Sequence, residues 1–301
     1  MDFEKKSKKY IDIHTHGAFG IDFNSANYDE INFALEKYYS NSICAICPTL
    51  VGDLDENIFR QLSLFKKIRQ EQLKNPKKQA LILGVHLEGT FLSPQKAGIQ
   101  NPKNFKKLTK ENFKNLVKDC QDIIKIVTLA PEEDEGLIDY LNSQNIITQA
   151  GHTTGQTIQN CKGVTHIFNA MSGIHHRKKS IALEALLDDN IYVEVIADLV
   201  HLSKDILNLI LKCKPKNRIL FVSDCLPCAK TNKEIIFCDK KIYPNGKDEN
   251  GTLAGSYKLL SEICENLVQN NIIFEDIDTF SFKNQINYLK LQKHEIDILN
   301  G

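Results

Sequence analysis

Eight short runs rich in Ile, Val and Leu limit the fold of this chain more than any other feature. Each run has the length of a β-strand, and most are separated by stretches whose apolar residues recur at helical spacing. The runs are YIDIHTH (residues 10–16), SICAICPTL (42–50), LILGVHLEG (81–89), IIKIVTLA (123–130), NIITQAGH (145–152), GVTHIFNA (163–170), IYVEVIAD (191–198) and RILFVSDC (218–225). Because strands that alternate with helices form a parallel sheet, eight such units predict an α/β fold of the (β/α)8 type, a TIM barrel.

The stretches between the runs predict the helices that cover the barrel. The clearest are residues 28–40, 56–73, 132–144 and 180–189. With 301 residues, the chain is long enough to bury a large core, and it contains no evident linker. We therefore expect a single barrel domain over residues 1–301, with strands from about residue 10 to 225 and closing helices to 301.

Polar residues gather at the carboxyl ends of the apolar runs. In the first run, Asp12, His14 and His16 alternate with apolar residues and so share one face of the predicted strand. The full set at the run ends is His14, His16, Thr49, His86, Glu88, Thr128, His152, His166, Asp198 and Asp224. A single histidine is more often structural than a ligand, but a barrel core does not require His, Glu or Asp at most strand ends. Since those ends meet on one face, the pattern predicts a divalent metal site in a hydrolase or lyase.

Composition excludes several other classes of function. The chain has 38 basic and 38 acidic residues, so neither nucleic acid nor a membrane surface is expected as a partner. The charged start MDFEKKSKKY does not match a signal peptide, and no run is long enough to span a membrane, which favours a cytoplasmic location. The nine cysteines are then expected to be reduced, and the pairs Cys44/Cys47 and Cys225/Cys228 are interpreted as core residues in preference to a zinc site.

Seven motifs, in this order, resemble one enzyme family. They are HTHG, GVHLEGTFLSPQKAGIQNP, AGHTTGQ, THIFNAMSGIHHR, IADLVH, VSDCLP and DENGTLAGS. The chain resembles the N-acetylglucosamine-6-phosphate deacetylases of the amidohydrolase superfamily from about residue 10 to about residue 270. The resemblance implies a metal-dependent hydrolase that removes the acetyl group from N-acetylglucosamine 6-phosphate, a small amino-sugar phosphate.

The resemblance also assigns the metal ligands. It implies that Glu88, His152 and His166 hold the primary ion, and that His14 and His16 match a pair that helps to hold a second ion in some members. The expected cofactor is one or two divalent metal ions per chain, with zinc as the first choice and iron, manganese or cobalt as alternatives, because nitrogen and oxygen ligands suit all four.

Roles in catalysis and substrate binding follow from the same resemblance. Asp224 matches the carboxylate that acts as general base and then as general acid. The residues implied to contact the substrate are Gln100, Asn169, Ala170 (through its amide), Arg177 and His201. Asn169, Ala170 and Arg177 match the phosphate site, and because this arginine can reach across a subunit interface in the family, a homodimer is expected.

The chain departs from the family pattern at several places. The family's small β-sandwich domain is expected to be missing, Thr90 replaces a proline, and Leu199 replaces a glycine. Gln100 replaces a histidine, and since an amide cannot become a cation, more of the oxyanion stabilisation would then fall on the metal. The segment between His152 and His166 is also short, so a helix there is expected to be a single turn or absent.

These departures keep two alternative functions open. One is a related amidohydrolase that acts on another N-acylated sugar phosphate or amino acid. The other is a barrel that binds a sugar phosphate with little turnover, although every implied metal ligand and the base are present in the sequence.

Overall fold

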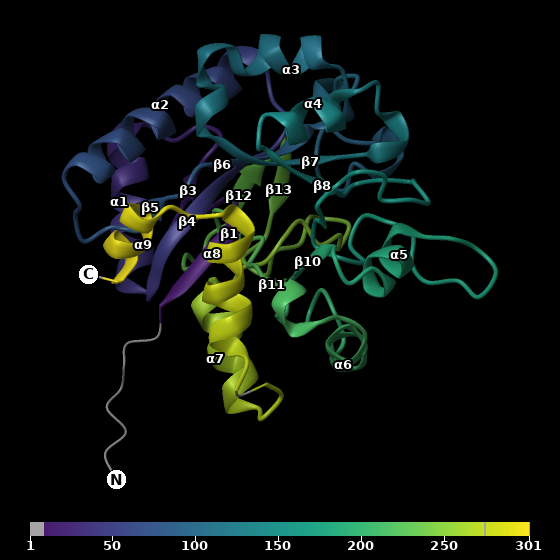
Figure 1. Cartoon of the computed structure of the whole chain (residues 1–301). Helices are drawn as coiled ribbons and strands as arrows, with labels where there is room; N and C mark the ends of the chain where they lie inside the picture. The colour runs from purple at the N-terminus through teal and green to yellow at the C-terminus, as the bar shows by residue number, and fades with distance from the viewer. Residues whose placement is uncertain (1–8, 274, 301) are drawn as a thin grey trace.

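The structure is a computed structural model that describes residues 9–273 and 275–300. Each of the eight predicted runs contains a strand, and these strands form one parallel sheet in chain order. The strands are β1 (Tyr10–Thr15), β4 (Ile43–Leu50), β6 (Val85–Phe91), β7 (Ile124–Leu129), β8 (Ile147–Ala150), β9 (Gly163–Val164), β10 (Tyr192–Val195) and β11 (Ile219–Phe221). Figure 1 shows them at the centre of the molecule with helices outside, so the predicted (β/α)8 barrel is confirmed.

The barrel closes between its first and last strands. Thr15 and Cys225 form a parallel bridge, the amide of Asp224 donates to the carbonyl of His14 at 2.9 Å, and the amide of His16 donates to the carbonyl of Cys225 at 2.8 Å. The buried carboxylate of Asp12 accepts hydrogen bonds from the amide and the hydroxyl of Ser223. Closure therefore places the ends of β1 and β11 side by side, with Nε2 of His14 3.4 Å from Oδ1 of Asp224.

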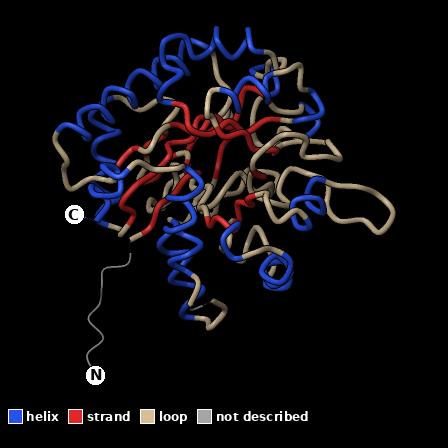
Figure 2. Tube along the Cα trace, viewed as in Figure 1, coloured by secondary structure: helices blue, strands red, loops and turns tan. Residues whose placement is uncertain are grey.

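The helices lie outside the strands, as the separate colours of Figure 2 make clear. They are α1 (Tyr28–Ser40), α2 (Asp55–Lys74), α3 (Lys110–Val117), α4 (Leu137–Ser143), α5 (Ile181–Leu187), α6 (Lys204–Cys213), α7 (Leu260–Gln269), α8 (Asn284–Leu289) and α9 (Lys293–Asn300). The sequence explains several of these starts: Asn27 and Glu30 form a capping box on α1, and Ser180 and Ser203 cap α5 and α6.

Two predicted helices are shorter than expected. The stretch 132–144 becomes helical only at Leu137, because residues Pro131–Glu133 form a 3-10 turn and the Asp134 carboxylate accepts from the amides of Leu137 and Ile138. Residues 180–189 form α5 only from Ile181 to Leu187. Between His152 and His166 the chain forms bends, turns and the short strand β9 but no helix, as the shortened segment predicted.

The described part of the chain also contains five short strands outside the eight barrel strands. β5 (Leu81–Ile82) pairs with β4, while β2 (Gly17–Ala18) pairs with β3 (Ile21–Asp22) and β12 (Ile235–Phe237) with β13 (Lys240–Ile242) as hairpins. The apolar faces of strands and helices pack into a continuous core between the two layers. Cys44, Cys47, Cys225 and Cys228 are buried free thiols, as expected of core residues. No helix in the described part of the chain has the length and apolar character needed to cross a bilayer.

Candidate active site

Glu88, His152 and His166 meet at the carboxyl ends of β6, β8 and β9. Oε1 of Glu88 lies 3.0 Å from Nε2 of His152 and 2.9 Å from Nε2 of His166, and the two ring nitrogens are 3.0 Å apart. All three side chains are buried. Two imidazole nitrogens and a carboxylate oxygen that point at one position form a set of ligands typical of a divalent ion.

A second group of ligand atoms adjoins the first. Nε2 of His16 lies 3.3 Å from Oε2 of Glu88 and 3.1 Å from Oδ1 of Asp224. Nε2 of His14 lies 3.6 Å from Oε1 of Glu88 and 3.4 Å from Oδ1 of Asp224. Glu88 thus stands between the pair His152 and His166 and the pair His14 and His16.

The hydrogen bonds of the histidines support a metal at this place. Nδ1 of His152 is 2.8 Å from the carbonyl of Lys96, which can only accept, so Nδ1 carries a proton and Nε2 is free to coordinate. Nε2 of His14 is buried and has no hydrogen-bond partner. A buried nitrogen without a partner is costly unless a cation occupies the space that it faces, so these residues fit a metal ion.

Electrostatics in the site favour a cation. Burial acts to lower the pKa of His14, but the carboxylates of Glu88 and Asp224 raise it well above its ordinary value. Burial acts in the opposite direction on the carboxylates, yet the imidazoles of His14 and His152 hold the pKa of Glu88 well below its usual range. The pKa of Asp224 is likewise lowered by His14 and His16 against the effect of burial, so Asp224 is ionised at neutral pH.

Left-handed backbone conformations cluster around these residues. The φ angles are 48° at His152, 30° at His166, 48° at Ala170, 62° at Leu199 and 52° at Asp224. Non-glycine residues adopt positive φ at a cost, and such residues concentrate at functional sites. Leu199 is the position at which the motif resemblance predicts a glycine, so this position adopts the conformation without the residue that adopts it most easily.

A cavity of about 310 Å³ opens over both groups of ligands. His201 lines it, and the Asp198 carboxylate fixes this ring by accepting from Nδ1 of His201 at 2.8 Å and from the amides of Val200 and His201. Asn169 and Ala170 lie on the cavity wall. Of the residues that the sequence predicts for the site, the fold brings these into one region: His14, His16, Glu88, His152, His166, Asn169, Ala170, His201 and Asp224.

Arg177 and Gln100 differ from the other predicted residues in their surroundings. Arg177 is exposed, is not among the residues that line the cavity, and lies on the loop before α5 that projects from the barrel in Figure 1. Gln100 does line the cavity, but its side chain bonds to the backbone: Nε2 donates to the carbonyl of Glu88 at 2.8 Å and Oε1 accepts from the amide of Gly52 at 3.0 Å.

Sequence reasoning missed several residues of the site, among them Lys96, Phe237 and Glu194. Lys96 and Phe237 line the cavity, Phe237 with its ring centroid 5.5 Å from that of His16. Glu194 on β10 is fully buried and contacts His14. The alternation of IYVEVIAD could have revealed Glu194, because a glutamate between two valines of a buried strand needs a partner.

Fold and site together define a class of protein: a (β/α)8 barrel with a buried histidine–carboxylate centre at the carboxyl ends of its strands, as in metal-dependent hydrolases. No family model matches the chain. The chain is 29% identical over 298 residues to the N-acetylglucosamine-6-phosphate deacetylase of Bacillus subtilis, covering 93% of this chain and 74% of that protein. It is 28% identical to the N-acetylgalactosamine-6-phosphate deacetylase of Escherichia coli O157:H7, covering 89% of this chain and 73% of the relative.

A solved structure of this kind of deacetylase is also similar to the chain. The crystal structure of the N-acetylglucosamine-6-phosphate deacetylase of Thermotoga maritima superposes with a TM-score of 0.81 at 28% identity, covering 94% of this chain and 78% of that one. The resemblance drawn from the sequence motifs is confirmed: over most of its length, this chain has homologues and structural neighbours among the N-acetylglucosamine-6-phosphate deacetylases, which are members of the amidohydrolase superfamily.

Proposed function

We propose that this protein is a metal-dependent amide hydrolase that converts N-acetylglucosamine 6-phosphate to glucosamine 6-phosphate and acetate. The observation that supports this proposal most directly is the meeting of Glu88, His152 and His166 beneath a cavity in a chain similar to such deacetylases. A cavity of about 310 Å³ is at the small end of ligand sites, which suits a monosaccharide phosphate.

In this proposal, Glu88, His152 and His166 hold the primary ion, while His14 and His16 hold a second. A divalent cation bound there would supply a nucleophilic water with a pKa of about 7 and would polarise the amide carbonyl. His152 presents its unprotonated nitrogen because the Lys96 carbonyl holds the proton on Nδ1. Nitrogen and oxygen ligands accept several divalent ions, and we propose zinc as the first choice.

Asp224 is proposed as the general base and then the general acid. Its carboxylate is ionised and lies beside His14 and His16, so it can accept a proton from the attacking water and deliver it to the departing amine. Protonation of the amine matters because an amine leaves poorly as an anion. His201 is proposed to contact the sugar, held in place by Asp198.

The proposed role of Gln100 differs from the substrate contact that the sequence resemblance implies. Since both ends of its amide bond to backbone groups, we propose that its contact with substrate is secondary to holding Glu88 and the neighbouring loop in place. Asn169 and the amide of Ala170 are proposed to bind the phosphate group.

An acetate-release assay on metal-loaded protein tests the function. N-acetylglucosamine 6-phosphate should be hydrolysed, and the 4-epimer, N-acetylgalactosamine 6-phosphate, should be assayed beside it because one relative is a deacetylase of that sugar phosphate. Asp224→Asn should retain metal and lose about 10²–10⁴-fold in kcat. Failure to release acetate from N-acetylglucosamine 6-phosphate, with release from another N-acyl compound, would favour a related amidohydrolase; binding without release would favour a barrel with little turnover.

We further propose a cytoplasmic homodimer in which the partner subunit's Arg177 completes the phosphate site. The position of Arg177 outside the cavity of its own chain supports this arrangement. A planar guanidinium can bind two phosphate oxygens at once. Mixing inactive Arg177→Ala and Asp224→Asn subunits should restore activity, because a mixed dimer contains one site with both residues intact; mixtures that stay inactive would contradict the shared site.

A further inference from the structure

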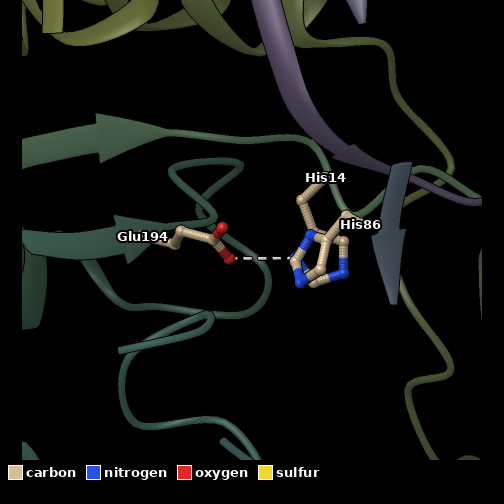
Figure 3. A group of neighbouring side chains, drawn as sticks. All are labelled: His14, His86 and Glu194. Atoms are coloured by element: carbon tan, nitrogen blue, oxygen red, sulfur yellow. Dashed lines mark hydrogen bonds and ion pairs between the residues drawn. The ribbon is translucent and has the colours of Figure 1, made fainter. Parts of the chain in front are cut away.

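A buried carboxylate lies beneath the metal ligands and contacts one of them. Figure 3 shows Glu194 on β10 directed across the barrel interior at His14 on β1. Oε2 of Glu194 is 2.9 Å from Nδ1 of His14, and neither side chain is exposed to solvent. Because an ionised carboxylate can only accept, Nδ1 of His14 must carry the proton. Its other nitrogen, Nε2, then faces Glu88 and Asp224.

The orientation of Glu194 is itself set by neighbours. Nε2 of Gln149 donates to Oε1 of Glu194 at 2.9 Å and to the hydroxyl of Tyr288 on α8 at 3.1 Å. Oε1 of Gln149 accepts from the hydroxyl of Thr165 at 2.7 Å, so the amide cannot turn over without losing these bonds. One oxygen of Glu194 is thus held by Gln149, and the other is directed at His14.

The neighbouring His86 does not turn this group into another metal site. His14, His86 and Glu194 are close enough for their ligand atoms to share an ion. Both ring nitrogens of His86 are already engaged, however: Nδ1 lies 3.1 Å from the carbonyl of Ile13, and Nε2 lies 2.7 Å from the hydroxyl of Thr128. The three side chains are therefore better described as a support beneath the site.

We propose that Glu194 is a positioning residue that keeps His14 in the tautomer able to coordinate a second metal ion, so that occupancy of the second position depends on Glu194. This inference rests on the proposed function for the metal site itself, and it adds a residue outside the set of ligands and substrate contacts. Hydrogen bonds from ligating histidines to carboxylates typically change metal affinity by about 10- to 100-fold.

Glu194→Gln tests the proposal with almost no change in shape. Gln149 would continue to donate to Oε1, so the new NH₂ group would face His14. Nδ1 of His14 would then have to accept, which moves the proton to Nε2 and prevents coordination there. We expect the affinity for the second ion to fall about 10- to 100-fold, with the primary ion retained. Metal content and equilibrium titration with Zn²⁺ measure this without any substrate.

Four further variants make the test specific. Tyr288→Phe removes the hydroxyl that also accepts from Nε2 of Gln149 but leaves Glu194 charged, so two ions should still bind. His14→Ala should lose the second ion, and adding Glu194→Gln to it should have no further effect on metal binding. Should Glu194→Gln fail to fold, Glu194→Asp takes its place and should bind the second ion more weakly than wild type and more tightly than His14→Ala.

Several results would overturn the proposal. They are a wild-type protein that binds a single ion at saturation, a folded Glu194→Gln protein with wild-type affinity for two ions, and an equal loss in Tyr288→Phe. Because the readout is metal binding, these results are distinct from failure of the deacetylase proposal, in which both ions bind but no acetate is released.

Discussion

At the scale of single residues, function in this protein coincides with unfavourable backbone geometry. His152, His166 and Asp224 all adopt positive φ, and each places a side chain over the carboxyl end of the barrel. Such conformations persist only where surrounding contacts impose them. Leu199 is informative because it has the same geometry but is not a proposed ligand, so it can be changed without touching the metal.

Changing Leu199 should isolate the cost of this geometry. Its side chain is half-buried against the core, so removing it costs stability in both Leu199→Ala and Leu199→Gly. Glycine adopts positive φ freely, whereas alanine does not, so Leu199→Gly should be more stable than Leu199→Ala by about 1 kcal/mol. Denaturant unfolding measures the difference; an alanine variant of equal or greater stability would show that Leu199 is not strained.

The Asp198–His201 pair predicts a pH dependence of stability. Burial acts to lower the pKa of His201, but its bond with Asp198 raises it; burial acts to raise the pKa of Asp198, but His201 lowers it. The pair therefore stabilises the folded state most between about pH 3.9 and pH 6.5, which are the pKa values of Asp and His in the unfolded chain. Its contribution is lost as pH falls through the lowered pKa of Asp198 and as pH rises through the raised pKa of His201.

Asp198→Asn is the matching variant. The difference in unfolding free energy between wild type and Asp198→Asn should be largest near about pH 5–6 and should shrink as pH rises above His201's pKa. Chemical denaturation across this range measures it. A difference that stays constant with pH would mean that the pair contributes through its neutral hydrogen bonds alone.

At the scale of elements, close approach between neighbouring strand ends shapes the site. Gly89 follows the ligand Glu88 on β6, and a Cβ atom added to Gly89 would lie 1.9 Å from the amide nitrogen of Gly52 after β4. The Gln100 side chain links the same two strand ends, because it accepts from the amide of Gly52 and donates to the carbonyl of Glu88. The glycine in the HLEG motif is therefore explained by packing between backbones.

Gly89→Ala should damage both stability and metal binding. The added methyl group meets backbone, which cannot move away as a flexible side chain can, so we expect a loss of at least about 1–3 kcal/mol and weaker binding of the primary ion. Gly173→Ala is the control, because a Cβ at Gly173 would meet nothing within 4 Å. Thermal unfolding and metal content measure both variants, and similar behaviour of the two would contradict the packing explanation.

At the scale of the whole molecule, the metal should act as part of the folded structure. The proposed ligands come from β1, from β6 and from the segments after β1, β8 and β9, so the ions would join segments from residue 14 to residue 166. An ion that binds only the folded chain stabilises it by mass action, by about 2.7 kcal/mol at a free concentration 100 times Kd.

Removing the metal should therefore lower the unfolding temperature. Chelation followed by dialysis should reduce Tm, and Zn²⁺ should restore it in proportion to occupancy. In a His152→Ala variant most of this effect should disappear, since the primary ion loses one of three ligands. A Tm that does not respond to chelator or metal in the wild-type protein would argue against a metal at Glu88, His152 and His166.

Much of this arrangement was predictable from the sequence, because it depends on residues that are near one another along the chain. Strand and helix periodicity depends on neighbouring residues, so the eight strands, and α1 within residues 28–40, were correctly placed. Parallel strands bring their carboxyl ends together whatever their side chains, which is why His14, Glu88, His152 and Asp224 could be grouped from the sequence alone. Helix α4 was overestimated because a capping aspartate delays its start.

The sequence by itself determined the barrel, the face that carries the site and the residue types that gather there. Only the tertiary structure decided the hydrogen bonds that give those residues their chemical states: Glu194 against His14 across 180 positions of the chain, the Lys96 carbonyl against His152, and Gln100 against backbone instead of open cavity. The physical reason is that periodicity is set by near neighbours, whereas a tautomer or an ionised carboxylate is set by groups that meet only after the barrel has closed.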